Sequence, residues 1–187
     1  MPEYLALPKR ILIDQDGVLA NFEAGFLAAW KQKFPDRSFI PLNERRTFYV
    51  RDDYPRELRT DVEGIYTAAG FIRNLPPIIG ALEALREMRE AGHIIRICTS
   101  PLSKYKNCVE EKYTWVEQYL GADWVKNIIL AKDKTEIRGD ILIDDRPKSR
   151  GDLEPNWEYV IFDQPYNRHA TNYRRLTSWA NWREILK

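Results

Sequence analysis

The chain has 187 residues, which suits one domain with room for a small insertion and is long enough to bury a sizeable core. Its charges are abundant but balanced, with 29 Lys and Arg against 28 Asp and Glu, which argues against a broad binding surface for nucleic acid polymers or anionic membranes. Two cysteines without CxxC spacing and two distant histidines indicate reduced structural thiols and argue against a zinc site or a disulfide framework.

No apolar stretch approaches the roughly 18 residues that a membrane span needs. The first ten residues also lack the long apolar core of a secretory signal. We therefore expect a soluble cytoplasmic protein that binds neither membranes nor nucleic acid polymers. The sequence leaves open whether the chain forms a homodimer.

Apolar runs rich in β-branched residues alternate with helical patterns along the chain. In chain order we expect a strand at 10–14, helices at 21–34 and 78–91, a strand at 94–98, a helix at 108–120, strands at 127–131, 141–143 and 159–162, and a last helix at 178–187 whose two tryptophans pack in the core. This alternation predicts an α/β fold with a doubly wound, mainly parallel, Rossmann-like sheet.

The segment 36–75 interrupts the alternation, because it is rich in Arg, Asp and aromatic residues. We interpret it as a small, mainly helical cap inserted into a core made of 1–35 and 76–187. Its own core is expected to include Phe39, Tyr54 and Phe71. The later stretch 163–176 is interpreted as an ordinary surface connection.

Polar residues follow the predicted strands at the ends where ligands bind in open α/β sheets. They are Asp14 and Asp16 after the first strand, Thr99 and Ser100 after the second, Lys132 and Lys134 after the third, and Asp144 and Asp145 after the fourth. Four carboxylates gathered at one sheet edge cannot all remain ionised without a cation. Oxygen ligands of this kind predict a hard divalent ion, Mg²⁺.

The remaining residues of this set suit a phosphate group. The hydroxyls of Thr99 and Ser100 can donate hydrogen bonds to phosphate oxygens, and a lysine adds positive charge. Each feature alone has an ordinary explanation as a turn, a helix start or a surface charge. Their ordered appearance after four separate strands indicates a site for phosphoryl transfer.

The same residues resemble a known family. A DxDGV sequence after a strand, then a Thr, a later Lys and a strand ending in DD is similar to the haloacid-dehalogenase-like phosphatases. The stretches DQDGVLANFEAGF, ICTSPLSKYKNC, EKYTWVEQYLG, DKT, ILIDDRP and SWANWREIL resemble the 5′(3′)-deoxyribonucleotidases over nearly the whole chain. The resemblance implies Mg²⁺-dependent removal of 5′ phosphates, and of 2′ or 3′ phosphates, from deoxyribonucleoside monophosphates through an aspartyl-phosphate.

The resemblance also implies a role for each motif residue. Asp14 would be the nucleophile and Asp16 the general acid and base. Gly17 would let the backbone turn tightly beside the metal. The implied metal ligands are Asp14, the backbone carbonyl of Asp16, and Asp145, with Asp144 acting through water or by orienting the others. The implied phosphate-binding residues are Thr99, Ser100, Lys134 and Lys112.

A pocket for base and sugar is implied by aromatic residues near the first motif and in the cap. Its expected members are Phe22, Phe48, Tyr49, Val50 and Tyr66, with Arg146 at its border. A base gains roughly 1–3 kcal/mol by stacking on an aromatic ring. The chain departs from the family pattern at Gln15, Asn21 and Ser103; the last stands where some relatives carry a lysine near the phosphate.

Two further functions fit part of this pattern. A phosphatase for another small phosphate ester would keep the core and change the pocket. A catalytically inactive nucleotide-binding module would keep the pocket, but the intact Asp14 and Asp16 argue against it.

Overall fold

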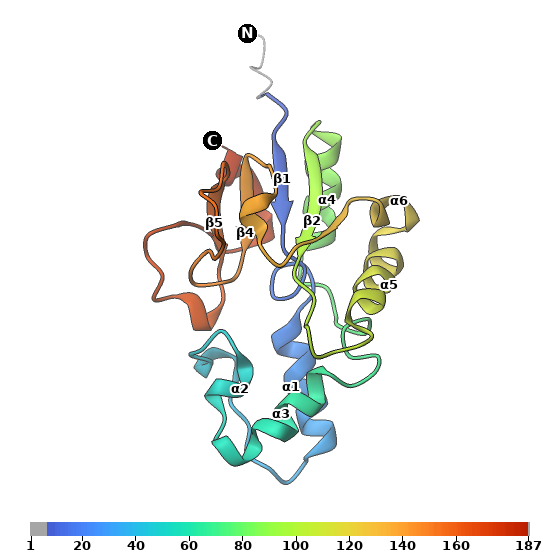
Figure 1. Cartoon of the computed structure of the whole chain (residues 1–187), viewed down its shortest axis with the longest axis vertical. Helices are drawn as coiled ribbons and strands as arrows, with labels where there is room; N and C mark the ends of the chain where they lie inside the picture. The colour runs from blue at the N-terminus through green and yellow to red at the C-terminus, as the bar shows by residue number, and fades with distance from the viewer. Residues whose placement is uncertain (1–6, 187) are drawn as a thin grey trace.

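A six-stranded parallel sheet forms the centre of the molecule in the computed structural model, which describes residues 7–186 (Figure 1). Its strand order is β3-β2-β1-β4-β5-β6. The strands are β1 (Arg10–Ile13), β2 (Ile94–Thr99), β3 (Ile128–Leu130), β4 (Ile141–Asp144), β5 (Glu158–Phe162) and β6 (Arg174–Leu176). The predicted α/β fold with a parallel sheet is confirmed, and β1 lies at the point where the strand order reverses.

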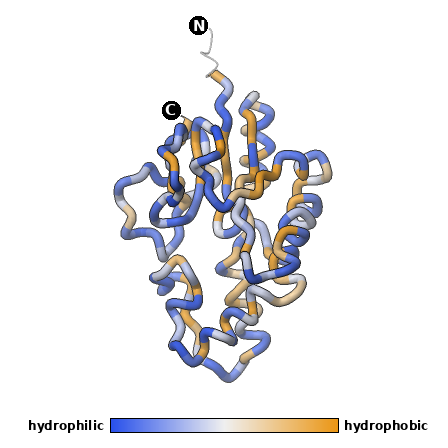
Figure 2. The backbone as a smooth tube through the Cα atoms, in the orientation of Figure 1, coloured by the Kyte–Doolittle hydropathy of each residue, from blue (hydrophilic) through white to orange (hydrophobic). Residues whose placement is uncertain are grey.

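One face of the sheet is covered by helices. These are α4 (Ala81–Glu90), α5 (Cys108–Leu120), α6 (Ala122–Val125) and the 3₁₀ helix η5 (Trp179–Leu186). Ile11, Ile13 and Ile97 from the central strands pack against Leu85 of α4 and Trp115 of α5, all fully buried. The apolar strands run through the middle of the backbone in Figure 2. Apolar burial on this scale is the main favourable term in folding.

Irregular segments cover the opposite face of the sheet. Leu12, Leu142 and Ile161 point to this side and pack with Trp157 and with Ala131. The sheet is therefore covered by helices on one face and by loops on the other. The two buried cysteines are free thiols, as predicted.

A second helical cluster lies beyond the carboxyl ends of the strands. It contains α1 (Phe22–Lys33), η1 (Leu42–Glu44), α2 (Val50–Asp53), η2 (Arg56–Leu58) and α3 (Arg59–Tyr66). Its core joins Phe26 and Trp30 of α1 to Val50, Tyr54, Val62 and Ile65. The helix α1 thus packs with the predicted cap, and Asn21 caps its first turn by accepting a hydrogen bond from the Ala24 N–H at 3.1 Å. Tyr54 is buried and Phe71 packs against this core as expected, but Phe39 is 41% exposed beneath the Lys31 ammonium.

The segment 163–176 is more than a surface connection, which corrects the prediction. It contains the 3₁₀ helix η4 (Pro165–Asn167) and the edge strand β6, which pairs in parallel with β5. Tyr166 and Asn167 in it are fully or almost fully buried. The strand escaped prediction because two of its three residues are arginines, which are unusual in a buried strand but suit a sheet edge.

The carboxy-terminal segment also differs in detail. It forms a 3₁₀ helix with a kink at Asn181 and not a regular α-helix, while its tryptophans, Trp179 and Trp182, are buried in the main core as expected. Within residues 7–186, no helix is both long and apolar enough to cross a bilayer.

Candidate active site

The carboxyl ends of four strands bring the predicted polar residues together. Asp14 follows β1, Thr99 ends β2, and Asp144 ends β4 with Asp145 next to it. Lys134 begins η3 (Lys134–Glu136), the turn that follows β3. Because parallel strands end at one edge of the sheet, residues about 130 positions apart in the sequence meet in one site.

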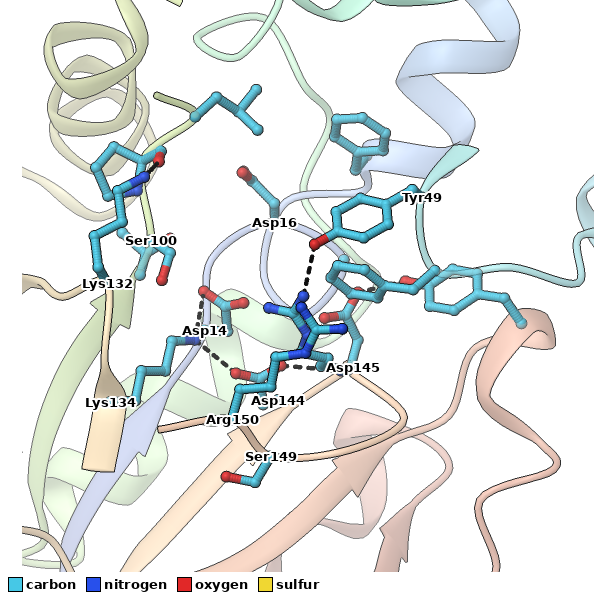
Figure 3. Close-up of a pocket in the computed structure, with 18 of the residues that line it drawn as sticks. Asp14, Asp16, Tyr49, Ser100, Lys132, Lys134, Asp144, Asp145, Ser149 and Arg150 are labelled. Carbon is cyan, nitrogen blue, oxygen red and sulfur yellow. Dashed lines mark hydrogen bonds and ion pairs between the residues drawn. The ribbon is translucent and has the colours of Figure 1, made fainter. Parts of the chain in front are cut away.

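Lys134 bridges two of the carboxylates. Its ammonium lies 3.1 Å from Asp14 Oδ1 and 2.6 Å from Asp144 Oδ2, and Figure 3 shows it between them. Although burial opposes ionisation, Lys134 holds the pKa of Asp144 below its ordinary value. The two carboxylates likewise outweigh burial and raise the pKa of Lys134. The ammonium therefore stays charged in the site.

Asp14 and Asp145 resist ionisation. Burial is the main cause that raises the pKa of Asp14, with Lys134 opposing it. Burial also raises the pKa of Asp145 well above its ordinary value, and the charges of Asp144 and Asp14 add to the effect. Three oxygens, one each from Asp14, Asp144 and Asp145, lie within 4.8 Å of one another. This is the electrostatic situation that a bound cation relieves.

The two carboxylate oxygens of Asp145 differ in their partners. Oδ2 accepts a hydrogen bond from the Tyr166 hydroxyl, whereas Oδ1 is buried and has no partner among residues 7–186. Both oxygens of Asp144 are occupied, by Lys134 and by the Arg146 N–H at 2.9 Å. A buried carboxylate oxygen without a partner is costly unless it binds a ligand.

Gly17 makes the close approach to Asp145 feasible. Its φ of +76° lies in the left-handed region that glycine tolerates best, and a Cβ atom there would overlap the Asp145 carboxylate. The turn that follows is closed by the N–H groups of Leu19 and Ala20, which donate to the Gln15 carbonyl at 2.9 and 2.8 Å. The first motif is therefore a tight loop that lies directly against the DD pair.

Lys112 contacts the site from the protein interior. Its side chain is fully buried on α5 and is not among the residues that line the cavity. Its ammonium contacts Asp16 Oδ2 at 2.7 Å and donates to Thr99 Oγ1 at 2.9 Å. Lys112 thus touches two cavity-lining residues, and its expected direct contact with phosphate stays a prediction.

A cavity of about 370 Å³ opens between the sheet edge and the cap. Every other predicted site residue lines it, including those expected to bind the base and sugar: Phe22, Phe48, Tyr49, Val50, Tyr66 and Arg146. A volume of this size falls in the range of small-molecule sites, which is about 300–1,000 Å³. The cavity therefore has a charged floor at the sheet edge and an aromatic wall on the cap side. Asp14, Lys134, Asp144 and Asp145 form the floor, and Phe22, Phe48, Tyr49 and Tyr66 form the wall.

The aromatic wall is held together by ring contacts. The ring centroids of Phe22 and Tyr66 lie 6.0 Å apart, and those of Phe48 and Tyr49 lie 5.1 Å apart. The guanidinium of Arg146 lies 4.7 Å from the Phe48 ring and donates to the Tyr49 hydroxyl at 2.7 Å. Arg146, which directly follows Asp144 and Asp145, therefore links the end of β4 to the cap across the cavity.

The polar rim of the cavity includes Ser100 and Lys132. The Ser100 hydroxyl donates to the Ala131 carbonyl, so binding a phosphate with this proton requires the hydroxyl to rotate. Lys132 donates to Ser103 Oγ at 2.8 Å, which places an ammonium near the position where some relatives carry a lysine.

Five further lining residues were not assigned from the sequence: Glu23, Ser149, Arg150, Tyr159 and Tyr166. Glu23 and Tyr159 lie on a predicted helix and a predicted strand, where no motif marked them as part of the site. Ser149, Arg150 and Tyr166 lie outside the predicted helices and strands, so no periodic pattern pointed to them.

Comparison with known proteins agrees with this geometry. Residues 9–187 match the family model described as 5′ nucleotidase, deoxy (pyrimidine), cytosolic type C protein. The chain belongs to the 5′(3′)-deoxyribonucleotidase family. It is 50% identical to the human cytosolic-type 5′(3′)-deoxyribonucleotidase over 192 residues, covering 97% of this chain and 95% of that protein. It is 44% identical to the human mitochondrial 5′(3′)-deoxyribonucleotidase, covering 95% and 82% of the two chains. Members of this family are phosphoric monoester hydrolases.

Solved structures show the same fold at low sequence identity. A HAD-family hydrolase from Deinococcus radiodurans, solved with bound phosphate and sodium, matches with a TM-score of 0.64 at 18% identity over 97% of this chain and 96% of that one. A HAD hydrolase from Bacillus subtilis, solved with magnesium, matches with a TM-score of 0.63 at 13% identity over 96% and 99%. These two structures show that the chain has the fold of HAD-family hydrolases.

Proposed function

We propose that the chain hydrolyses the phosphate of deoxyribonucleoside monophosphates in a Mg²⁺-dependent reaction that passes through an aspartyl-phosphate on Asp14. The observation that carries this proposal is the meeting of Asp14, Lys134, Asp144 and Asp145 on the floor of an aromatic cavity. The names of the family and of the two human relatives supply the substrate class. Both 5′ and 2′ or 3′ phosphates are included in the proposal.

The donor set fits a divalent cation. The Asp145 Oδ1 atom is buried and has no partner in the described part of the chain, and oxygens of Asp14 and Asp144 lie nearby. Mg²⁺ would be held by Asp14, the backbone carbonyl of Asp16 and Asp145, with Asp144 as the residue that orients them or binds through water. Asp145 is favoured over Asp144 as direct ligand because both Asp144 oxygens already have partners. When bound, Mg²⁺ neutralises carboxylate and phosphate charge.

Asp14 and Asp16 perform the covalent chemistry in this proposal. An Asp14 oxygen attacks phosphorus, and the bond from phosphorus to the sugar oxygen breaks while Asp16 gives that oxygen a proton. Asp16 then takes a proton from water as the water oxygen attacks the phosphorus and releases Asp14 and inorganic phosphate. The Thr99 hydroxyl accepts a hydrogen bond from Lys112, so its own proton remains available for donation. In this proposal Thr99 and Lys134 together bind the phosphoryl oxygens.

The aromatic wall provides the site for base and sugar. Stacking on Phe22 or Phe48 contributes roughly 1–3 kcal/mol for a planar base. Tyr66, Val50 and Tyr49 complete the wall on the cap side, and Arg146 borders it. We infer that the cap determines substrate choice and that it includes α1 as well as 36–75, because the buried residues of α1 pack with that segment.

A cytoplasmic site of action is part of the proposal and is supported by the cytosolic type of the human relative. The partner is a small nucleotide, and nothing in the charge pattern favours a nucleic acid polymer.

The test is phosphate release by the purified full chain with Mg²⁺. We expect dUMP and dTMP to give a higher kcat/KM than UMP, dGMP or a hexose phosphate. Asp14→Asn should lower kcat by at least about 10³-fold. Asp123→Asn, the same change at a carboxylate that is 87% exposed, is the matched control and should leave kcat unchanged.

Three results would count against the proposal. No phosphate release from dUMP or dTMP would reject it. A higher kcat/KM for the hexose phosphate would support a phosphatase for another ester. Equal activity of the wild type and Asp14→Asn would show that Asp14 is not the nucleophile.

A further inference from the structure

We propose that Tyr166 is a positioning residue that orients Asp145 for binding the divalent cation. The inference rests on the proposed function in taking Asp145 as a metal ligand. It adds a residue from the segment 163–176, which sequence reasoning had interpreted as a surface connection.

The two oxygens of Asp145 have different surroundings, and Tyr166 contacts only one of them. The Tyr166 hydroxyl donates to Oδ2, and the tyrosine is only 2% exposed. The other oxygen, Oδ1, is buried and unpartnered among the described residues. A hydrogen bond to one oxygen fixes the carboxylate plane, so the remaining oxygen keeps a set direction toward the cation.

The turn that carries Tyr166 also holds the backbone of the loop after β1 and the backbone at Asp145 after β4. The Asn167 amide donates to the Asp145 carbonyl at 2.7 Å and to the Phe162 carbonyl at 2.8 Å. The Gln164 amide donates to the Gly17 carbonyl at 2.7 Å. The segment 164–167 therefore links the loop that contains Gly17, after β1, to the backbone of Asp145, after β4.

Residues of the cap contact the Tyr166 ring. The guanidinium of Arg45 lies 5.4 Å from the Tyr166 ring centroid, and the Phe48 ring meets it edge-on at 6.0 Å. Arg45 is itself buried and paired with Glu23 at 2.6 Å and with Asp53. Contacts from core and cap thus leave the phenol little freedom to turn away from Asp145.

The test is the Mg²⁺ affinity of the substrate-free full chain, measured by calorimetry for the wild type and Tyr166→Phe. Loss of a hydrogen bond to a metal-binding carboxylate typically weakens metal binding by about 10–100-fold, and we expect at least a tenfold rise in Kd. At saturating Mg²⁺, kcat should recover to within about threefold of wild type, because no reacting atom is removed. Tyr54→Phe removes a buried phenol oxygen that accepts from the Ile40 N–H at 3.3 Å in the cap, and it should leave the Kd unchanged.

A second readout separates positioning from general destabilisation. The rise in Tm caused by saturating Mg²⁺ should be smaller for Tyr166→Phe than for the wild type and unchanged for Tyr54→Phe. An unchanged Mg²⁺ Kd in Tyr166→Phe, or the same weakening in both variants, would overturn the inference. Because neither measurement uses substrate, a wild-type chain that binds Mg²⁺ but releases no phosphate would reject the proposed function and leave this inference standing.

Discussion

The ammonium of Lys112 lies 2.7 Å from Asp16 Oδ2 while its side chain is fully buried. The same ammonium donates to Thr99, which lines the phosphate end of the cavity. A single interior lysine thus holds both the proposed acid and base and a proposed phosphate-binding hydroxyl. It does so from the protein interior, since Lys112 is not among the residues that line the cavity.

Lys112→Met should therefore lower kcat more than it raises KM. The variant frees Asp16 from its partner, and misplacement of a general acid and base costs about 10²-fold in kcat. Steady-state kinetics on dUMP measure both parameters, and circular dichroism establishes that the variant is folded. Lys106→Met, at an exposed lysine of the neighbouring loop, is the control. A large rise in KM with unchanged kcat would show instead that Lys112 contacts the phosphate.

Gly17→Ala should weaken Mg²⁺ binding and reduce stability. The positive φ alone costs about 1 kcal/mol for alanine, and the new methyl group would displace the Asp145 carboxylate. Gly64→Ala is the matched control, since no atom lies near its added Cβ inside α3, and it should stabilise the chain by about 0.5–1 kcal/mol. Thermal unfolding and Mg²⁺ titration test both variants. Equal behaviour of the two would contradict the close packing of the motif loops.

Mg²⁺ affinity should rise with pH. The raised pKa values of Asp145 and Asp14 mean that the metal-free folded chain keeps protons that the unfolded chain has already lost. These groups therefore lower the stability of the metal-free chain as pH rises above about 3.8 toward their folded pKa values. Mg²⁺ displaces the protons, so binding should release them and the Mg²⁺-induced rise in Tm should be larger at pH 7.5 than at pH 5.5.

Calorimetry in two buffers of different ionisation enthalpy measures that proton release. Net proton uptake, or a Mg²⁺ affinity that falls as pH rises, would contradict the electrostatic account of the site.

Gln15→Leu should be tolerated. The Gln15 side chain is fully buried, its amide donates to the Lys112 carbonyl at 3.2 Å, and its Oε1 has no partner among residues 7–186. The leucine removes one hydrogen bond together with one unsatisfied acceptor, so the free energy of unfolding should change by no more than about 1.5 kcal/mol. Chemical denaturation tests this, and a kcat loss greater than about tenfold would instead give Gln15 a role in placing α5.

The sequence predicted the fold where local patterns and global packing agree. Ile11, Ile13 and Ile97 stand in β-branched runs, and the glycines after α4 and α5 end those helices where expected. The edge strand β6 was missed because Arg174 and Arg175 pair at a sheet edge, where burial does not impose an apolar pattern. Sequence position places a residue on an element, but it does not determine which neighbour the side chain reaches.

That limit applies to two residues at the site. The resemblance implies that Lys112 reaches the phosphate, but its contacts with Asp16 and Thr99 depend on how α5 packs, which the sequence does not give. Tyr166 escaped notice because it lies in a polar turn, and only the tertiary fold brings its hydroxyl to Asp145. The resemblance already implies Asp145 and not Asp144 as the direct ligand. The structure adds a reason for proposing it, because both Asp144 oxygens have partners whereas Asp145 Oδ1 has none among residues 7–186.

Asp14 is the proposed nucleophile, and the most direct test of that role is a crystal structure of the full chain with Mg²⁺ and BeF₃⁻, a mimic of an acyl-phosphate. We predict beryllium bonded to an Asp14 carboxylate oxygen, with fluorines within hydrogen-bond reach of Thr99 Oγ1 and Lys134 Nζ. Beryllium bonded to any other residue, Asp16 included, would show that Asp14 is not the nucleophile.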